Sequence, residues 1–171
     1  MVSGRLIKIN RSNGGLPKYP VGGPVMLAPD GIEGDRHLHL KYHGGPNKAV
    51  LMMASELIDN LAGKSYPVYY GALGENLTVR GLNPRSWRSG QRYRVGEDAL
   101  IELTTLRVPC TQLLPYSSTG DEPIGPELYD AQAKAGDTSS PHWAHGGFYA
   151  KVIRPGLLFE DAPVTLESDI A

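Results

Sequence analysis

The chain has 171 residues, of which 40% are hydrophobic and 20% charged, a composition typical of an ordinary globular domain. Its 17 Lys and Arg residues nearly balance 18 Asp and Glu residues, so its charge gives no reason to expect nucleic acid or an acidic membrane as a partner. One cysteine excludes an internal disulfide framework and an all-cysteine zinc site, and no apolar run approaches the roughly 20 residues of a transmembrane helix. We expect a single cytoplasmic domain over residues 1–171 whose ligand is a small, neutral or anionic molecule.

Short strands joined by tight turns dominate the predicted secondary structure, because 21 glycines and 14 prolines favour turns over a helical bundle. Alternating or continuous apolar residues predict strands at residues 5–10, 25–27, 49–53, 91–95, 99–105, 148–153 and 164–166. In the first of these strands we expect Ile7 and Ile9 on one face and Leu6 and Lys8 on the other. The sequence therefore predicts a mainly β fold of about eight short strands, closed or nearly closed into a barrel, since closure protects strand edges.

Two helices are expected between the strands. The first follows Ser55, whose side chain can cap it, and ends at Gly63. The second spans residues 127–135 and ends at Gly136.

The only cysteine follows the strand predicted at residues 99–105. Pro109 has no N–H and restricts the residue before it to extended geometry, so the chain should leave this strand at a reproducible point just before Cys110. Arg107 lies three residues upstream, and a guanidinium near a thiol favours the thiolate, which is the nucleophilic and metal-binding form. A lone cysteine can equally be a small buried hydrophobic residue.

The densest polar region lies between residues 31 and 50. It contains Glu33, Asp35, Arg36, His37, His39, His43 and Lys48. Its three histidines could form a zinc site, although no carboxylate has a convincing catalytic spacing. Alternatively, Gly44 and Gly45 could offer backbone N–H groups to an anion, with Arg36 and Lys48 supplying positive charge. A solvated polar loop would explain the same composition.

Two further features complete the predicted site. Glu75 and Asn76 follow a glycine and precede a short strand, a pattern that on its own is typical of a turn. Polar and glycine-rich positions fall in the loops, while the strands between them have apolar faces. We therefore predict that the Cys110 loop, the loop over residues 35–48 and the Glu75-Asn76 turn converge on one cleft.

Six stretches, in this order, resemble the MOSC family, the domain found at the C-terminus of molybdenum cofactor sulfurases. They are GGLPKYPV (14–21), GIEGDRH (31–37), HGGPNKAV (43–50), ALGENLTVRGL (72–82), LRVPC (106–110) and GFYAKVIRPG (147–156). The resemblance covers nearly the whole chain and includes the family's cysteine. It implies a β-barrel that binds a molybdopterin-type molybdenum cofactor or transfers sulfur to it; the family also has an association with pyridoxal phosphate.

The resemblance also implies roles for individual residues. Related amidoxime-reducing proteins coordinate molybdenum through the matching cysteine, so Cys110 would be the metal ligand or the sulfur carrier. Lys18 and Arg36 would hold the pterin phosphate. The full predicted set of cofactor-binding residues is Lys18, Asp35, Arg36, His37, His43, Lys48, Glu75, Asn76 and Arg107. A thiolate suits a thiophilic metal and a phosphate requires basic side chains and backbone donors, so this set is chemically consistent.

The sequence departs from the family in residues 139–152, where many relatives have an arginine-containing glycine turn, and we assign no function there. The chain ends at Ala171 without a fused electron-transfer module, so we expect a separate electron-transfer or sulfur-donor protein as its partner. Two other functions stay open. Cys110 could be the nucleophile of a metal-independent enzyme with one of the histidines at 37, 39 or 43 as its base, or the protein could be a non-catalytic binding module.

Overall fold

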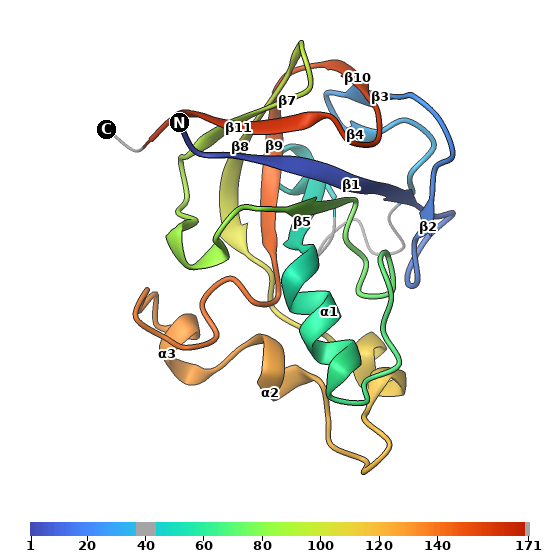
Figure 1. The fold of residues 1–171 in the computed structure, drawn as a ribbon, viewed down its shortest axis with the longest axis vertical. Helices are drawn as coiled ribbons and strands as arrows, with labels where there is room; N and C mark the ends of the chain where they lie inside the picture. The colour runs from blue at the N-terminus through green and yellow to red at the C-terminus, as the bar shows by residue number, and fades with distance from the viewer. Residues whose placement is uncertain (37–43, 170–171) are drawn as a thin grey trace.

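Seven strands close into a mixed β-barrel in the upper part of the molecule (Figure 1), which confirms the predicted fold class. The computed structural model describes residues 1–36 and 44–169. Its strands are β1 (Ser3–Arg11), β2 (Tyr19–Pro20), β3 (Val25–Ala28), β4 (Gly31–Ile32), β5 (Val50–Ala54), β6 (Leu77–Arg80), β7 (Arg92–Val95), β8 (Ala99–Leu106), β9 (Phe148–Arg154), β10 (Gly156–Leu158) and β11 (Pro163–Ser168). The barrel order is β11-β7-β8-β9-β5-β6-β1, and β1 pairs back onto β11 to close it. Only β5 and β6 pair in parallel among these neighbours, while β10, β3 and β4 form a small separate sheet.

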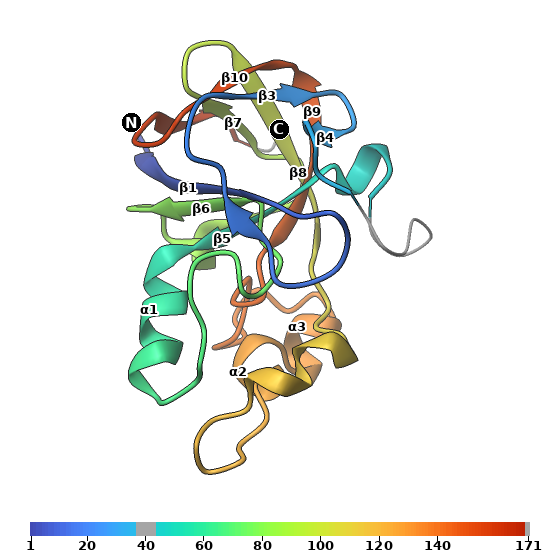
Figure 2. The same cartoon turned by 90° about the vertical axis from the view of Figure 1, so that its right-hand side faces the viewer.

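The helices pack together below the barrel, as the view in Figure 2 shows. They are α1 (Ser55–Gly63), α2 (Gly125–Leu128) and α3 (Ala131–Lys134), with 3-10 turns η1 (Pro46–Lys48), η2 (Pro84–Ser86) and η3 (Thr111–Tyr116). None of the helices within the described ranges is long and apolar enough to cross a lipid bilayer.

Both helix predictions need correction at their ends. Ser55 does not cap α1; the cap position is Ala54, and the Ser55 hydroxyl donates to Glu56 instead. The helix expected over residues 127–135 is broken in two, because Asp130 has extended backbone geometry and accepts the Ala133 N–H as the N-cap of α3. A polar residue that can cap a helix thus ends one helix and begins the next.

The burial pattern of β1 also differs from the prediction. Leu6 and Ile9 are fully buried, whereas Ile7 is only half-buried. The reason is a register shift between Leu6 and Lys8 in the pairing with β6. Such a bulge inserts one residue and moves the side chains beyond it to the opposite face, which simple alternation does not reveal.

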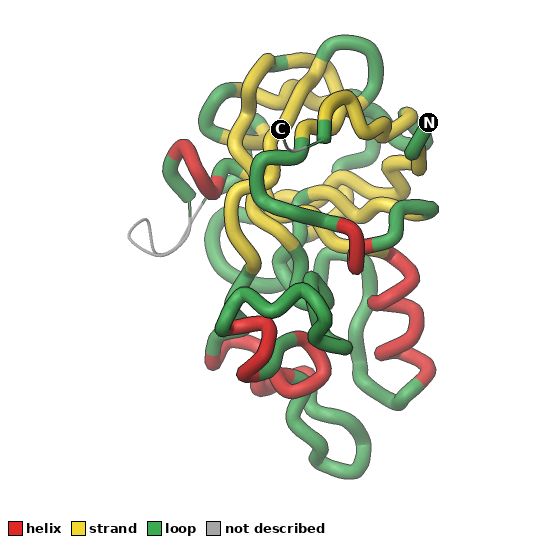
Figure 3. Tube along the Cα trace, turned by 90° about the vertical axis from the view of Figure 1, so that its left-hand side faces the viewer, coloured by secondary structure: helices red, strands yellow, loops and turns green. Residues whose placement is uncertain are grey.

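Strands β5 and β9 are covered on both faces, and this arrangement determines where a ligand can bind. Val50, Met52 and Phe148 point into the barrel core, while their neighbours Leu51 and Tyr149 belong to a second apolar cluster outside it. That second cluster contains residues of α1 and α2. Figure 3 shows the helices on one side of the strands. Its edge forms one wall of the cleft described below.

Candidate functional site

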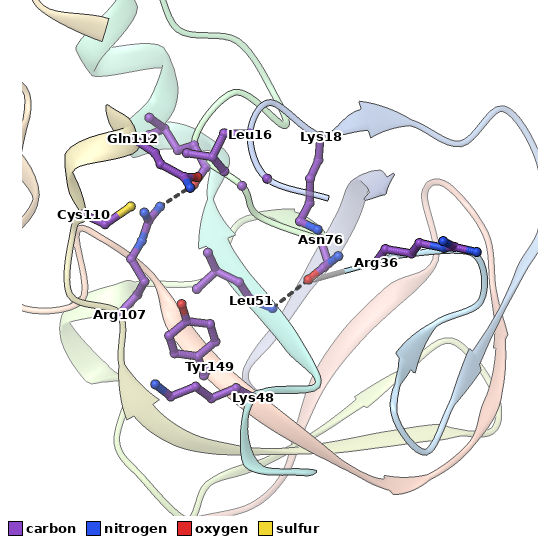
Figure 4. Close-up of a pocket in the computed structure, with 13 residues that line it drawn as sticks. Leu16, Lys18, Arg36, Lys48, Leu51, Asn76, Arg107, Cys110, Gln112 and Tyr149 are labelled. Atoms are coloured by element: carbon purple, nitrogen blue, oxygen red, sulfur yellow. Dashed lines mark hydrogen bonds between the residues drawn. The ribbon is translucent and has the colours of Figure 1, made fainter. Parts of the chain in front are cut away.

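A cleft opens on the outer face of β5 and β9, beside the second apolar cluster (Figure 4). It encloses about 570 Å³ of empty space, its open mouth included. The residues that line it come from distant parts of the chain: Gly15, Leu16, Lys18, Arg36, Lys48, Leu51, Leu73, Gly74, Asn76, Arg107, Cys110, Gln112 and Tyr149. Cys110, Asn76 and the two ends of the polar loop, Arg36 and Lys48, thus line one cleft as predicted, whereas Glu75 does not line it and residues 37–43 lie outside the described residues.

Cys110 lies at one end of the cleft with its side chain partly exposed. Strand β8 ends at Leu106, and the next residue, Arg107, is 4% exposed. Its guanidinium donates to the carbonyls of Gly146, at 2.9 Å, and Leu73. These bonds join three segments of the chain and fix a positive charge beside the thiol.

The charge on Arg107 has no carboxylate bonded to it in the described part of the chain. Burial lowers the pKa of Arg107, and the nearby Tyr149, Glu75 and Cys110 oppose that shift by favouring the cation. Arg107 is thus a buried cation whose nearest partners are carbonyl oxygens, an arrangement that attracts negative charge to this end of the cleft.

Tyr149 forms part of the cleft wall and was not predicted as a site residue. It pairs with Leu51 across β9 and β5, which places both side chains on the outer face of the barrel. The Lys48 ammonium lies 5.0 Å from the centre of the Tyr149 ring, a cation–π distance. Burial raises the pKa of Tyr149, so its hydroxyl stays protonated and can act as a hydrogen-bond donor.

Arg36 lies away from Cys110, beyond Lys18 and Asn76, in the view of Figure 4. Its side chain is exposed, and its backbone N–H is fixed to the carbonyl of Ser12 at 2.9 Å. The cleft therefore has a thiol in one part and an accessible guanidinium in another.

Lys18 also lines the cleft, but its ammonium is held within the protein. Its Nζ lies 2.6 Å from Asp35 Oδ1, and the two side chains are 8% and 1% exposed. The Asp35 carboxylate also accepts the Ser12 N–H at 2.9 Å and the Asn76 amide at 2.9 Å. The positive charge of Lys18 is thus balanced by Asp35, which leaves the exposed Arg36 better placed to meet an anion.

Asn76 connects the cleft to the sheet through three hydrogen bonds. Its Oδ1 accepts the Leu51 N–H at 3.0 Å, and its Nδ2 donates to the carbonyl of Asn10 and to Asp35. The side chain thereby extends the β5–β6 ladder by one position. Gly74, two residues earlier, has φ +89, and a Cβ there would lie 2.3 Å from a Leu16 methyl group. The positive φ favours glycine at this position, and the absence of a Cβ leaves room for the Leu16 side chain.

Glu75 is placed differently from the other predicted residues. It is fully buried and does not line the cleft, although both of its chain neighbours do. Its Oε2 accepts the Gly71 N–H and the Thr78 hydroxyl. Burial raises the pKa of Glu75 to about 6.

The three histidines proposed as zinc ligands or as a catalytic base, His37, His39 and His43, lie outside the described residues. Among residues 1–36 and 44–169, no group of three or more His, Cys, Asp or Glu side chains could hold a metal ion. Sequence reasoning missed the apolar wall of the cleft and its hydroxyl and amide groups: Leu16, Leu51, Leu73, Gln112 and Tyr149. The alternation of β9 could have indicated Tyr149, since Phe148 and Ala150 face the barrel core.

The family model for the MOSC domain matches residues 39–165. The chain belongs to the MOSC domain family. This domain is 31% identical to protein YiiM of Escherichia coli over 161 residues, which are 91% of this chain and 65% of YiiM. The crystal structure of Escherichia coli YiiM superimposes with a TM-score of 0.66 at 26% identity, covering 98% of this chain and 71% of that one.

Two other relatives match shorter parts of this MOSC protein. The uncharacterized protein YflK of Bacillus subtilis is 37% identical over 100 residues, which are 58% of this chain and 45% of YflK. A protein of Gibberella moniliformis named a reductase is 32% identical over 95 residues, which are 53% of this chain and 17% of that protein. The chain thus spans less than two thirds of the length of the curated relatives it matches.

Proposed function

We propose that this MOSC domain binds a molybdopterin-type molybdenum cofactor in the cleft and serves as the catalytic unit of a reductase for N-hydroxylated compounds. The observation that best supports this proposal is that two different kinds of ligand-binding group line the same cleft. A partly exposed thiol lies in one part of it and an accessible guanidinium in another. A soft metal and a phosphate on the same molecule require these two kinds of group at separate places.

The lining residues fit such a cofactor. Cys110 would be the protein ligand of molybdenum, beside the buried charge of Arg107. Arg36, helped by Lys48, would bind the phosphate through charge-assisted hydrogen bonds. Between them, the apolar side chains of Leu16 and Leu51 would pack against the flat pterin ring.

The reaction is a two-electron reduction: an N-hydroxylated compound takes up two electrons and two protons, its N–O bond breaks, and an amine and water are released. When bound, the molybdenum centre supplies the two electrons. The chain would exclude water through its apolar wall and orient the hydroxylated nitrogen with the donor groups of Tyr149 and Gln112. We expect a separate electron-transfer protein to return the electrons. The relative named a reductase supports this class of function.

Sulfur transfer to the cofactor is the second candidate, and the partial exposure of Cys110 favours it. A sulfur carrier needs a thiol that a donor protein can reach, and it does not need a cofactor that stays bound through purification. The two functions therefore predict different amounts of cofactor and of Cys110-bound sulfur in the purified protein.

The test is to purify the protein from a host that makes the cofactor and to measure molybdenum and pterin per chain. A reductase should retain both in near-equal amounts and should reduce an N-hydroxylated amine with a chemically reduced viologen dye as electron donor. Protein from a host unable to make the cofactor is the matched control and should be inactive. A protein without molybdenum, but with sulfur on Cys110 that reducing agents release, would favour the carrier function. Absence of both would exclude both proposals.

A further inference from the structure

Two buried oxygen atoms behind the cleft have no hydrogen-bond partner among the described residues. They are Oε1 of Glu75 and Oδ1 of Asn10, and both side chains are fully buried. Unsatisfied buried acceptors are rare, and the side chains that carry these two share a hydrogen-bond partner.

That shared partner is Thr78. Its hydroxyl donates to Glu75 Oε2 at 3.2 Å and accepts from Asn10 Nδ2 at 3.1 Å. The amide of Asn10 cannot simply be turned over to supply the missing donor. Its Nδ2 also donates to the Glu75 carbonyl at 3.1 Å, and the inverted amide would place two acceptors against each other there.

We propose that Glu75 is a buried proton switch: when protonated, its Oε1 donates a hydrogen bond to Asn10 Oδ1 and fixes the cleft floor, and loss of the proton loosens that floor. The cleft floor is defined here as residues 71–76. One proton shared between the two orphaned oxygens would give each of them a hydrogen-bond partner.

The bonds of the cleft floor explain how this proton would affect the cleft. Glu75 Oε2 anchors Gly71 at the start of the floor, and Asn10 anchors its end by accepting from Asn76 Nδ2 and donating its N–H to the Asn76 carbonyl at 2.8 Å. Asn76 lines the cleft and accepts the Leu51 N–H. An ionised Glu75 would turn its second oxygen, now negative, toward the Asn10 oxygen and strain this connection.

The surroundings of Glu75 shift its pKa in both directions. The Gly71 N–H, the N–H of Glu75 itself and the Thr78 hydroxyl favour the ionised carboxylate, as does Arg107 beyond the end of β8. Burial outweighs them, so the pKa rises from 4.5 to about 6. Tyr116, at the end of η3, is also in range, and the Glu75 charge contributes to raising its pKa. The switch would therefore operate between mildly acidic and neutral pH.

The experiment uses the ligand-free, full-length protein, so it does not depend on the proposed reductase function. The side-chain carboxyl carbon of Glu75 is followed by NMR on protein labelled with carbon-13, assigned through its own backbone amide. We expect its titration midpoint near pH 6, above the ordinary 4.5 of a glutamate side chain. A Glu75 midpoint at or below 4.5 would overturn the proposal.

A second readout tests the effect on the cleft. Hydrogen exchange of the Leu51 and Asn76 amides is measured from pH 4.5 to pH 7.5, with the chemical exchange rate divided out. Their protection should fall by about 15-fold, because about 1.5 pKa units of linkage correspond to about 30-fold in total and a factor of about two is already lost at pH 4.5. In Glu75→Gln, whose amide can donate to Asn10 permanently, protection should not change with pH, while Glu97→Gln should behave as the wild type. Constant protection in the wild-type protein would exclude the switch, whether or not the variant folds.

Discussion

Replacing Lys18 distinguishes a structural role for this residue from the predicted role in cofactor binding. In Lys18→Met the side chain keeps most of its volume but loses the charge that balances Asp35. The Asp35 side chain is 1% exposed, so its carboxylate would remain buried with two hydrogen-bond donors, the Ser12 N–H and the Asn76 amide. Breaking a buried ion pair on one side typically destabilises by about 3–5 kcal/mol. Because the Ser12 N–H and the Asn76 amide still donate to the carboxylate, we expect the free energy of unfolding to fall by about 3 kcal/mol.

The assay is urea denaturation followed by the fluorescence of the two tryptophans, both of which are buried in the folded protein. Asp35→Asn in the Lys18→Met background should recover most of the lost stability, because the uncompensated charge is then gone. Lys8→Met is the matched control. It breaks an exposed ion pair with Glu160 of 3.0 Å and should cost less than about 1 kcal/mol.

The reasoning would be refuted by a Lys18→Met protein of wild-type stability. If the same protein also lost its molybdenum and pterin, Lys18 would bind the cofactor directly, as the family resemblance implies, and the ion pair with Asp35 would open on binding. Unchanged cofactor content together with a clear loss of stability would establish Lys18 as structural.

Three other predictions concern the two parts of the cleft and the residue behind it. Arg36→Ala should lower cofactor content at least about ten-fold without a change in Tm, because one charge-assisted hydrogen bond of about 1.5–3 kcal/mol is lost. The control is Arg85→Ala, which replaces another exposed arginine. Cys110→Ser should lose molybdenum and keep the fold, because a hydroxyl is a much harder and less acidic ligand than a thiol. Val108→Ala, at a neighbouring exposed position, should retain the metal. A Cys110→Ser protein with full metal content would contradict the assignment. For Glu75, a folded-state pKa raised from 4.5 to about 6 means that the folded protein holds the proton more tightly than the unfolded chain. The free energy of unfolding should therefore fall by about 2 kcal/mol as the pH rises from below 4.5 through 6, and urea titrations that show no such fall would contradict it.

Much of the barrel could be predicted from the sequence because its signals are local. The all-apolar run that forms β5 and the alternation of β8 identify strands by pattern alone, and the three-residue turn between β7 and β8 is visible as Gly96 and two acidic residues. The errors arose where a non-local contact decides the outcome. The bulge in β1 depends on its pairing with β6, and Ser55 faces Arg80 and Glu56 rather than the free N–H groups of its own helix.

The candidate site could be predicted only in part for the same reason. Cys110 and Arg36 could be singled out from the sequence because one follows a proline and the other lies in a polar, glycine-rich segment, both of which are local signals. The segment at Glu75 and Asn76 is typical of an ordinary turn, yet both side chains are at most 1% exposed, since their hydrogen bonds join β1, β5 and β6. No local pattern indicates that a carboxyl group and an amide will be buried together. Only the pairing of β1 with β6 brings Asn10 to them.

The position of the cleft follows from how the barrel is filled. Tyr93, Met52 and Phe148 are almost completely buried in the barrel core, so no ligand of cofactor size can enter it. A binding site must instead use a face that the helices cover incompletely, and the outer face of β5 and β9 is such a face. A substitution in the barrel core should therefore lower stability without changing what binds in the cleft. Removing core volume, as in Phe148→Ala, should destabilise by about 3–5 kcal/mol, yet molybdenum per folded molecule should stay close to wild type. Equal losses of stability and of molybdenum per folded molecule would mean that the core and the cleft are coupled more tightly than this arrangement of the two apolar clusters implies.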